Sequence, residues 1–478
     1  MIWFLVFCVF ACYLIIKIVQ RYVAVSRQLH FIEKIPGPPL KSKILGNVEE
    51  TICPPADMPT MVYARYKEYG SMLRIWIGGF PLVFIAEGKF AEVFFTSECT
   101  EIKPEFYRLL HVWLGLGLLT SSGQLWEQRR KLITPAFHYS ILSEFCEVFI
   151  SNTLTLIDQL RQNPDGTLVN VMTQMKLIAL ENICETAMGI KIDALKNPNH
   201  NYIRAVEDAM LMTRMSKPWL WNEVLFSLSP TGRKHWRDLS TIFEQTDMAI
   251  ESRRRMRENK NNHFRMGSEE FDGAVSKMAF LDLLLEAGEE NSVSLSDEDL
   301  RDEGQHTTSV SMGYILFLLG NHPEIQEKSH QELDDIFQGS NRKPTQVIKE
   351  GLRLFPGIPL MGREVAEDMQ VGDYTVPKGT VLVLSSYTLH RDPEVFPDPD
   401  KFDPDHFSPE KSAGRHPYAY VPFAAGPRNC PGTLTISLTF YTCRRLKLES
   451  SIFSYIVLSS VRNSPLSFTS HVAHQARF

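Results

Sequence analysis

The chain has 478 residues, of which 44% are hydrophobic and 22% are charged, and these proportions exclude a collagen-like, low-complexity or wholly disordered protein. Its formal net charge of −6 provides no global basic field, so nucleic acid is not an expected partner. Eight cysteines in so long a chain, with no C-x-x-C pair, argue against a disulfide scaffold or a structural zinc site.

The N-terminal segment is apolar. Residues 1–16 carry no charge, and the apolar run resumes after Lys17. A helix of about nineteen residues spans roughly 28 Å, close to the thickness of a bilayer's hydrocarbon core. Arg21 and Arg27 follow the run, which places the rest of the chain in the cytosol. A cleaved signal peptide is the alternative, but a charged n-region and a clear cleavage site are missing. We therefore predict an uncleaved membrane anchor over residues 1–24.

A basic, proline-rich linker over residues 25–40 connects this anchor to the body. It contains Ile35-Pro36-Gly37-Pro38-Pro39, which cannot be helical and predicts a rigid turn. Over most of residues 126–300 and 321–337, apolar side chains recur every three or four positions, as in amphipathic helices. Short apolar runs predict strands at Leu73–Ile77, Leu82–Ile85, Tyr374–Val376 and Thr380–Leu384. The predicted fold class is mainly α with a small β portion.

The strongest chemical signal is the loop from Phe423 to Gly432, which surrounds Cys430. A lone cysteine is usually a small buried hydrophobe. Here Gly426 and Gly432 permit a tight turn and the close approach of a flat ligand. Arg428 can pair with an acid group on that ligand and also favour the thiolate, and Phe423 can pack beside the sulfur. These features meet the requirements of a thiolate ligand to haem iron.

The pattern F-x-x-G-x-R-x-C-x-G in this loop resembles the cytochrome P-450 family of haem-thiolate monooxygenases. The resemblance implies that Cys430 is the axial ligand of a haem b. It also implies the family fold, in which the haem lies between the oxygen-activating helix and the cysteine loop. Residues 41–478 would then form the haem-thiolate catalytic domain.

Glu350-Gly351-Leu352-Arg353 resembles the family's E-x-x-R element. Residues three apart share a helix face, so Glu350 and Arg353 can pair. In the family, this pair fixes the core under the haem together with a downstream arginine. His406 stands at that downstream position and lacks the bidentate fork of an arginine. The sequence therefore predicts a weakened triad.

Trp126-Glu127-Gln128-Arg129-Arg130 resembles the family's W-x-x-x-R element. Because residues four apart share a helix face, Trp126 and Arg130 can both reach a haem propionate. Arg129 and Lys131 are then expected to point to solvent. Arg363 occupies the family's third propionate-binding position.

Residues 117–138, 317–328 and 414–430 resemble the fourth family, the fatty-acid ω-hydroxylase branch, and especially its insect members. This resemblance implies an endoplasmic-reticulum protein with one membrane span and a cytosolic catalytic domain. It implies electrons from NADPH through a reductase, with cytochrome b5 as a further candidate partner. The implied substrate is a fatty acid or a similar lipid, hormone or xenobiotic.

The predicted oxygen-activating helix departs from the family pattern. Thr307 occupies the alcohol position of the family's acid–alcohol pair, but His306 replaces the acid. A histidine can relay protons near neutral pH, so the change weakens proton delivery without abolishing it. Glu303 stands directly before Gly304, as does the glutamate that many members of this branch esterify to haem. Glu303 is therefore a candidate for covalent haem attachment and, with His306 and Thr307, for catalysis.

Two further segments depart from the family. The stretch 338–349 is too short for the helix expected there. After Gly432, residues 434–440 show a period-2 pattern that is typical of a strand and not of the family's helix under the haem. Nothing in residues 433–478 resembles the family's final sheet. An alternative splice product or an incorrect gene model would explain such a tail, and either could be inactive.

Three functions remain open at this stage. The first is a membrane-anchored monooxygenase acting on aliphatic substrates. The second is a haem-binding protein with little oxygenase activity, which acts as an isomerase or binds a ligand. The third is a tethered helical protein without haem, in which Cys430 is structural.

Overall fold

The computed structural model describes residues 16, 26–41, 46–47, 49, 53–54, 57–77, 80–137, 139–162, 169–208, 214, 218–265, 280–283, 285, 314–316, 318–319, 321–328 and 346–432. Nearly all of the predicted anchor, the catalytic candidates Glu303, His306 and Thr307, and the segment 433–478 lie outside these residues. Within the part of the chain that is described, no helix combines the length and apolar character needed to cross a membrane.

Helices dominate, with a small β portion, as the sequence predicts. The helices of the first half include α2 (Met58–Tyr69), α3 (Gly88–Thr96), α4 (Arg108–Leu114), α5 (Gly123–Ile133), α6 (Tyr139–Arg161), α7 (Val171–Ile183) and α8 (Asn201–Asp208). Those that follow are α10 (Glu223–Leu228), α11 (Pro230–Arg265), α16 (Gln346–Leu354), α17 (Ser386–Leu389) and α18 (Pro409–Ser412).

The strands are β1 (Met72–Ile77), β2 (Phe80–Ile85), β3 (Leu360–Glu364), β4 (Met369–Val371), β5 (Tyr374–Val376) and β6 (Val381–Ser385). The larger sheet has the order β1-β2-β6-β3, and β4 pairs with β5 separately. β2 and β6 are parallel, with Leu82 opposite Val381, whereas the other pairs are antiparallel. The predictions for β1, β2, β5 and β6 are confirmed within one or two residues, and β3 and β4 were not predicted.

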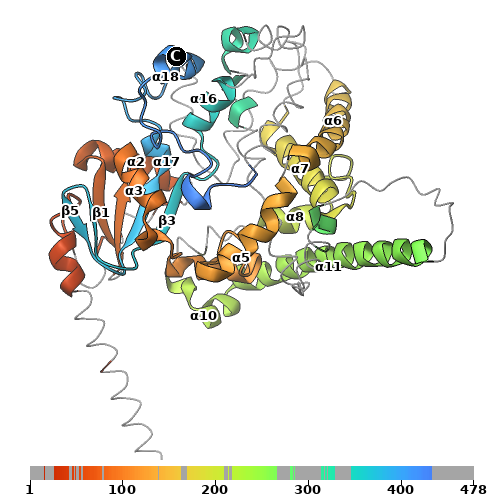
Figure 1. The fold of residues 1–478 in the computed structure, drawn as a ribbon, viewed down its shortest axis with the longest axis horizontal. Coiled ribbons are helices and arrows are strands. Elements are labelled where there is room, and N and C mark those ends of the chain that lie inside the picture. Colours follow the sequence, from red (N-terminus) through yellow and green to blue (C-terminus); the bar gives the residue numbers. More distant parts are fainter. Residues whose placement is uncertain are drawn as a thin grey trace, which may run out of the picture.

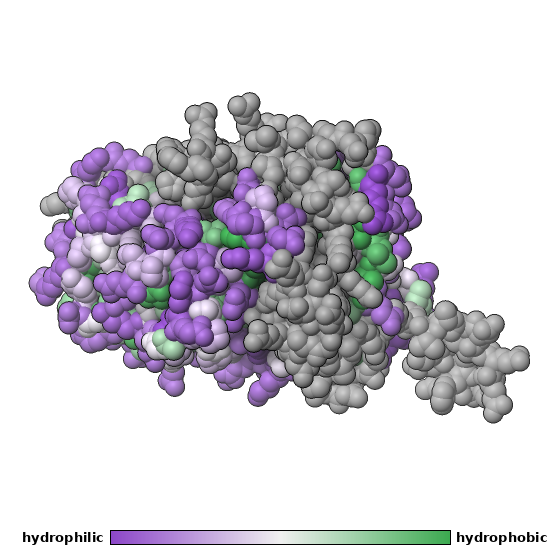
Figure 2. All heavy atoms as spheres, turned by 90° about the horizontal axis from the view of Figure 1, so that it is seen from above, coloured by the Kyte–Doolittle hydropathy of each residue, from purple (hydrophilic) through white to green (hydrophobic). Residues whose placement is uncertain are grey.

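The sheet and the main helical group form two adjacent parts of the molecule. In Figure 1, the sheet lies on one side of the molecule together with α2, α3 and α17. The helices α6, α7, α8 and α11 lie on the other side of the molecule. Apolar residues of β2, β6 and α3 form one buried cluster. Residues of α6, α7, α8, α11 and α16 form another. On the face drawn in Figure 2, most of the coloured residues are hydrophilic, which agrees with apolar side chains packed inward.

Candidate functional site

The cysteine loop is folded back on itself. The amide of Cys430 donates a hydrogen bond to the carbonyl oxygen of Phe423 at 2.9 Å. A 3-10 turn at Gly426–Arg428 lies between them. Ala424 and Gly426 have φ angles of 58° and 67°, in the left-handed region that favours glycine. The loop therefore presents Cys430 at the end of a tight turn.

Of the two loop glycines, Gly426 and Gly432, the packing requires Gly426. A Cβ on Gly426 would lie 2.5 Å from the carbonyl oxygen of Phe95 in α3. A Cβ on Gly432 would make only ordinary contacts, the nearest at 3.7 Å to Phe137 and 3.8 Å to the sulfur of Cys430. The loop is thus fitted against the end of α3 through Gly426.

The substitution Gly426→Ala is expected to lower the thermal stability of the haem-loaded protein and to reduce the fraction with a thiolate-type spectrum. The positive φ alone costs an alanine about 1–2 kcal/mol, and the contact with Phe95 adds to this. Gly414→Ala is the matched control, because Gly414 also has a positive φ, of 76°, but nothing lies within 4 Å of its Cβ position. Equal losses in the two variants would contradict the packing argument.

The charge that acts on the Cys430 thiol comes from α5. Burial raises the pKa of Cys430, while the amide of Gly432 and the guanidinium of Arg130 act in the opposite direction. Arg130 donates from Nη1 to the carbonyl oxygen of Asn429 and from Nη2 to its Oδ1, both at 2.7 Å. From the sequence, this influence on the thiol was expected of Arg428. The structure assigns it to Arg130, because the helix brings that guanidinium to the loop.

Trp126, one turn earlier on α5, contacts the same loop through Arg428. The guanidinium carbon of Arg428 lies 4.2 Å from the ring centroid of Trp126, and its Nη1 donates to the carbonyl oxygen of Ser121 at 3.1 Å. Its Nε and Nη2 are buried and have no hydrogen-bond partner among the described residues. Burial, followed by the nearby charge of Arg363, lowers the pKa of Arg428 to about 10. Two guanidinium nitrogens of Arg428 are thus desolvated beside the cysteine loop, where they can donate to an acidic ligand.

Arg363 lies on β3 and is also buried, with 6% of its surface exposed. Burial lowers its pKa, and Tyr107 and Glu101 partly offset this effect. Neither Arg363 nor Arg428 forms an ion pair with a carboxylate of the described residues. Because a buried cation without such a partner is costly, this region favours an anionic ligand. A haem fits the donor set, since its propionates would accept from Arg428 and Arg363 and its iron would take the Cys430 thiolate.

One expectation for α5 is wrong. Arg129 was expected to point to solvent, but only 9% of it is exposed, because the helix packs this side against the protein. Lys131 is exposed, as expected.

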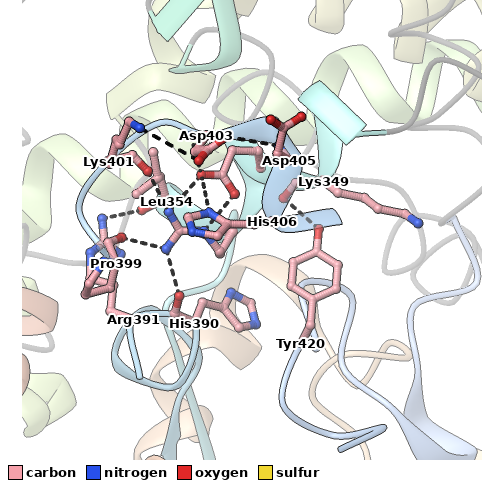
Figure 3. A network of polar contacts seen from close by, with 12 residues as sticks. Lys349, Leu354, His390, Arg391, Pro399, Lys401, Asp403, Asp405, His406 and Tyr420 are labelled. Carbon is pink, nitrogen blue, oxygen red and sulfur yellow. Dashed lines mark hydrogen bonds and ion pairs between the residues drawn. The ribbon is translucent and has the colours of Figure 1, made fainter. Parts of the chain in front are cut away.

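The E-x-x-R residues of α16 form the centre of a buried network, whose surrounding residues, among them His390 and His406, are labelled in Figure 3. Arg353 donates from Nε to Oε2 of Glu350 at 2.7 Å and from Nη2 to Oε1 at 2.8 Å. Both side chains have 0% exposure. Arg353 also donates to the carbonyl oxygens of His390, Pro399 and Lys401, at 2.9, 2.6 and 2.9 Å. The pair therefore ties α16 to the segment that leads toward the cysteine loop.

His406, which stands where the family has an arginine, makes hydrogen-bond contacts in this network. Its Nδ1 lies 3.2 Å from Oε1 of Glu350, and its Nε2 lies 2.7 Å from the carbonyl oxygen of Pro397. In this orientation both ring nitrogens face acceptors. The amide of Asp403 adds a donor to Glu350 at 2.8 Å. His406 supplies one contact to the carboxylate, and the weakening of the triad stays a prediction.

Sequence reasoning missed two cations of this site. Arg415 stacks on Phe396, with 4.4 Å from its guanidinium carbon to the ring centroid, and donates to the carbonyl oxygen of His406 at 2.6 Å. Lys103 lies close enough to Arg363 and Arg428 for their charges to affect its pKa. No helical spacing or motif links either residue to the site, since only the tertiary fold brings them there.

The sequence and the fold both match known proteins. The family model for Cytochrome P450 matches residues 36–434. "Cytochrome P450 4V2" of Mus musculus is 41% identical over 381 residues, which cover 76% of this chain and 73% of that protein. "Cytochrome P450 4c3" of Drosophila melanogaster is 39% identical over 437 residues, with 85% and 81% coverage. The solved "Crystal structure of cytochrome P450DA heme domain" matches with a TM-score of 0.72 and 22% identity, covering 87% of this chain and 90% of that one.

Proposed function

Because the chain belongs to the cytochrome P-450 family of haem monooxygenases, we propose that it inserts one atom of dioxygen into a long-chain aliphatic substrate, a fatty acid or a similar lipid. The substrate class rests on the resemblance to the fourth family. Relatives named Cytochrome P450 4V2 and 4c3 are consistent with it. A hormone or a xenobiotic of similar apolar character is a less favoured substrate.

The observation that carries the proposal is the position of Cys430 beside desolvated cations. The loop presents the thiol, and two buried guanidinium nitrogens of Arg428 have no hydrogen-bond partner in the part of the chain that the structure describes. When bound, the haem supplies dioxygen activation, and electron donation from the thiolate favours O–O cleavage. In the proposed site, Cys430 ligates the iron, and the propionates are held by Trp126, Arg130, Arg363 and Arg428. Phe423, Gly426 and Gly432 shape the loop, as the backbone contacts of Phe423 and Gly426 suggest.

Proton delivery is assigned to residues outside the described part of the chain. In this proposal Thr307 and His306 would hold and pass the protons that oxygen activation needs, and Glu303 is a candidate for an ester bond to the haem. The replacement of an acid by His306 favours a second candidate function, a haem protein with little oxygenase activity. That protein would bind haem through the same Cys430 and differ only in turnover.

The proposed setting is the endoplasmic-reticulum membrane, with residues 1–24 as the anchor and the catalytic domain in the cytosol. The proposed electron source is NADPH through cytochrome P-450 reductase, with cytochrome b5 as an additional donor. The apolar N-terminal run and the charges after it support this arrangement.

The test is a carbon-monoxide difference spectrum of the full chain after dithionite reduction, followed by turnover with NADPH, reductase and a long-chain fatty acid. A strongly red-shifted Soret band with a hydroxylated product supports the monooxygenase. The same band without product, for wild type and for His306→Asp alike, favours the haem protein with little oxygenase activity. Absence of any haem spectrum would overturn both and leave Cys430 a structural residue.

A further inference from the structure

A small apolar cluster brings together polar side chains from three segments of the chain. Its buried members are Leu220 and Phe226, and Trp113 of α4 packs against them. Arg214 Nη1, Trp113 Nε1 and His235 Nε2 are all buried, and none has a hydrogen-bond partner among the residues that the structure describes. Because a buried donor without an acceptor costs free energy, this arrangement favours a ligand that accepts hydrogen bonds.

Arg214 is the charged member of this group, and only 1% of it is exposed. Its guanidinium carbon lies 4.1 Å from the ring centroid of Phe226. Its Nε donates to the carbonyl oxygen of Leu220 at 3.0 Å, and its Nη2 donates to that of Trp221 at 3.4 Å. Nη2 also donates to Oε1 of Glu223 at 2.9 Å. These contacts fix the guanidinium in one orientation, in which Nη1 is the nitrogen that can take a further acceptor.

His235 of α11 lies beside the same aromatic ring, with 5.4 Å between the ring centroids of His235 and Phe226. Burial, followed by the charge of Arg214, lowers the pKa of His235 to about 4, and Glu223 partly offsets this. His235 is therefore uncharged at neutral pH and can donate one hydrogen bond from Nε2. The side chain of Glu223 is 49% exposed, so solvent screens its charge and it neutralises Arg214 only in part.

The helix α4 connects this group to the proposed haem site. Directly before α4, Tyr107 forms a hydrogen bond with the backbone of Gly362, next to Arg363 on β3. Near the other end of α4, Trp113 packs on the apolar cluster. Six helical residues separate Tyr107 from Trp113, a rise of about 9 Å, and most of α4 is apolar. A ligand that reaches from the cluster to the haem therefore needs an acid group at one end and a long apolar chain.

We propose that Arg214, together with the side-chain N–H groups of Trp113 and His235, binds the carboxylate of the fatty-acid substrate and so leaves the other end of the chain for the haem. The inference rests on the proposed function and deepens it, because it assigns the residues that recognise the acid group. A carboxylate only accepts hydrogen bonds and carries the negative charge that pairs with a guanidinium.

The experiment measures binding without turnover. Palmitate is titrated into the haem-loaded full chain in the absence of NADPH, and its dissociation constant is measured from the Soret shift and by calorimetry. Trp113→Phe removes the indole N–H and is expected to weaken palmitate binding about tenfold, the size of one hydrogen bond to a charged group. Trp236→Phe is the matched control, because Trp236 is 41% exposed and its Nε1 already donates to Oγ of Ser227 at 3.2 Å. This control should bind palmitate as the wild type does.

Two charge variants test the guanidinium. Arg214→Met is expected to weaken palmitate binding by about tenfold or more. Glu223→Gln alters an exposed acid, so its folding is not at risk. It should strengthen palmitate binding about two- to fivefold, because Arg214 then has no competing carboxylate. Palmitate methyl ester carries no charge, so the wild type and Glu223→Gln should bind it equally.

The proposed carboxylate site is overturned if Trp113→Phe or Glu223→Gln binds palmitate with the affinity of the wild type. It is also overturned if Glu223→Gln changes the affinity for palmitate and for its methyl ester by the same factor. In both cases the thiolate-type spectrum of the wild type still supports the proposed function. If the wild type forms no thiolate-type complex, the proposed function itself fails, and this inference fails with it.

Discussion

Cys430→Ser is expected to abolish the strongly red-shifted Soret band of the reduced carbon-monoxide complex and, with it, all NADPH-dependent turnover. A serine hydroxyl does not ionise near neutral pH, so it cannot replace the thiolate that donates electrons to the iron. The loop should still fold, because the hydrogen bond that closes it comes from the backbone amide of residue 430 to the carbonyl oxygen of Phe423. Haem retention and the carbon-monoxide spectrum should be measured on the same preparation.

Cys53→Ser serves as the matched control for this variant. Cys53 is half-buried and lies before α2, away from the cysteine loop in sequence. Its replacement should leave the carbon-monoxide spectrum and turnover unchanged. A normal red-shifted band in Cys430→Ser would mean that another residue ligates the iron, and the proposed site would be wrong.

Glu350→Gln is expected to destabilise the protein by about 3–5 kcal/mol, the cost of leaving a buried charge without its partner. Arg353 would keep its carbonyl contacts but lose the carboxylate in a site with 0% exposure. This destabilisation is a large part of the free energy of unfolding of a typical protein, which is about 5–15 kcal/mol. The melting temperature and the amount of soluble haem-loaded protein measure the effect.

The exposed Glu410 in α18 offers a control, because Glu410→Gln removes the same charge from a solvated position. An unchanged melting temperature in Glu350→Gln would show that the network does not stabilise the fold. Burial raises the pKa of Glu350, but hydrogen bonds from Arg353 and His406 outweigh it, so the pKa is lowered overall. The stability from Glu350 is therefore present above its ordinary pKa and lost as pH falls through the lowered value.

The sequence predicted features that depend on local spacing. Glu350 and Arg353 are one helical turn apart, so their pairing follows from the helix alone. The short apolar runs of β1, β2 and β6 likewise lie within single segments, so they predicted strands without knowledge of the tertiary fold. β3 was missed because Gly362 and the adjoining Pro359 interrupt its apolar pattern, and it becomes a strand by pairing with β6.

Contacts between distant segments could not be predicted in this way. The carbonyl oxygens that accept hydrogen bonds from Arg353 belong to loop residues 390, 399 and 401. The sequence of these loops has no periodic pattern from which their backbone conformation could be predicted. Lys103 and Arg415 likewise reach the site only through the fold. The family resemblance supplied the roles of Cys430 and Arg363, whereas the influence of Arg130 on the thiol required the position of α5.

The parallel pairing of β2 with β6 has a consequence for biosynthesis. During synthesis, the central strand pair cannot form until residue 381, the partner of residue 82, has been added to the chain. At about 5–20 residues per second, that wait lasts on the order of tens of seconds. During this time β1 and β2 present an open strand edge, a template for association with other chains. Nascent chains of this protein should therefore depend on chaperones until β6 has emerged.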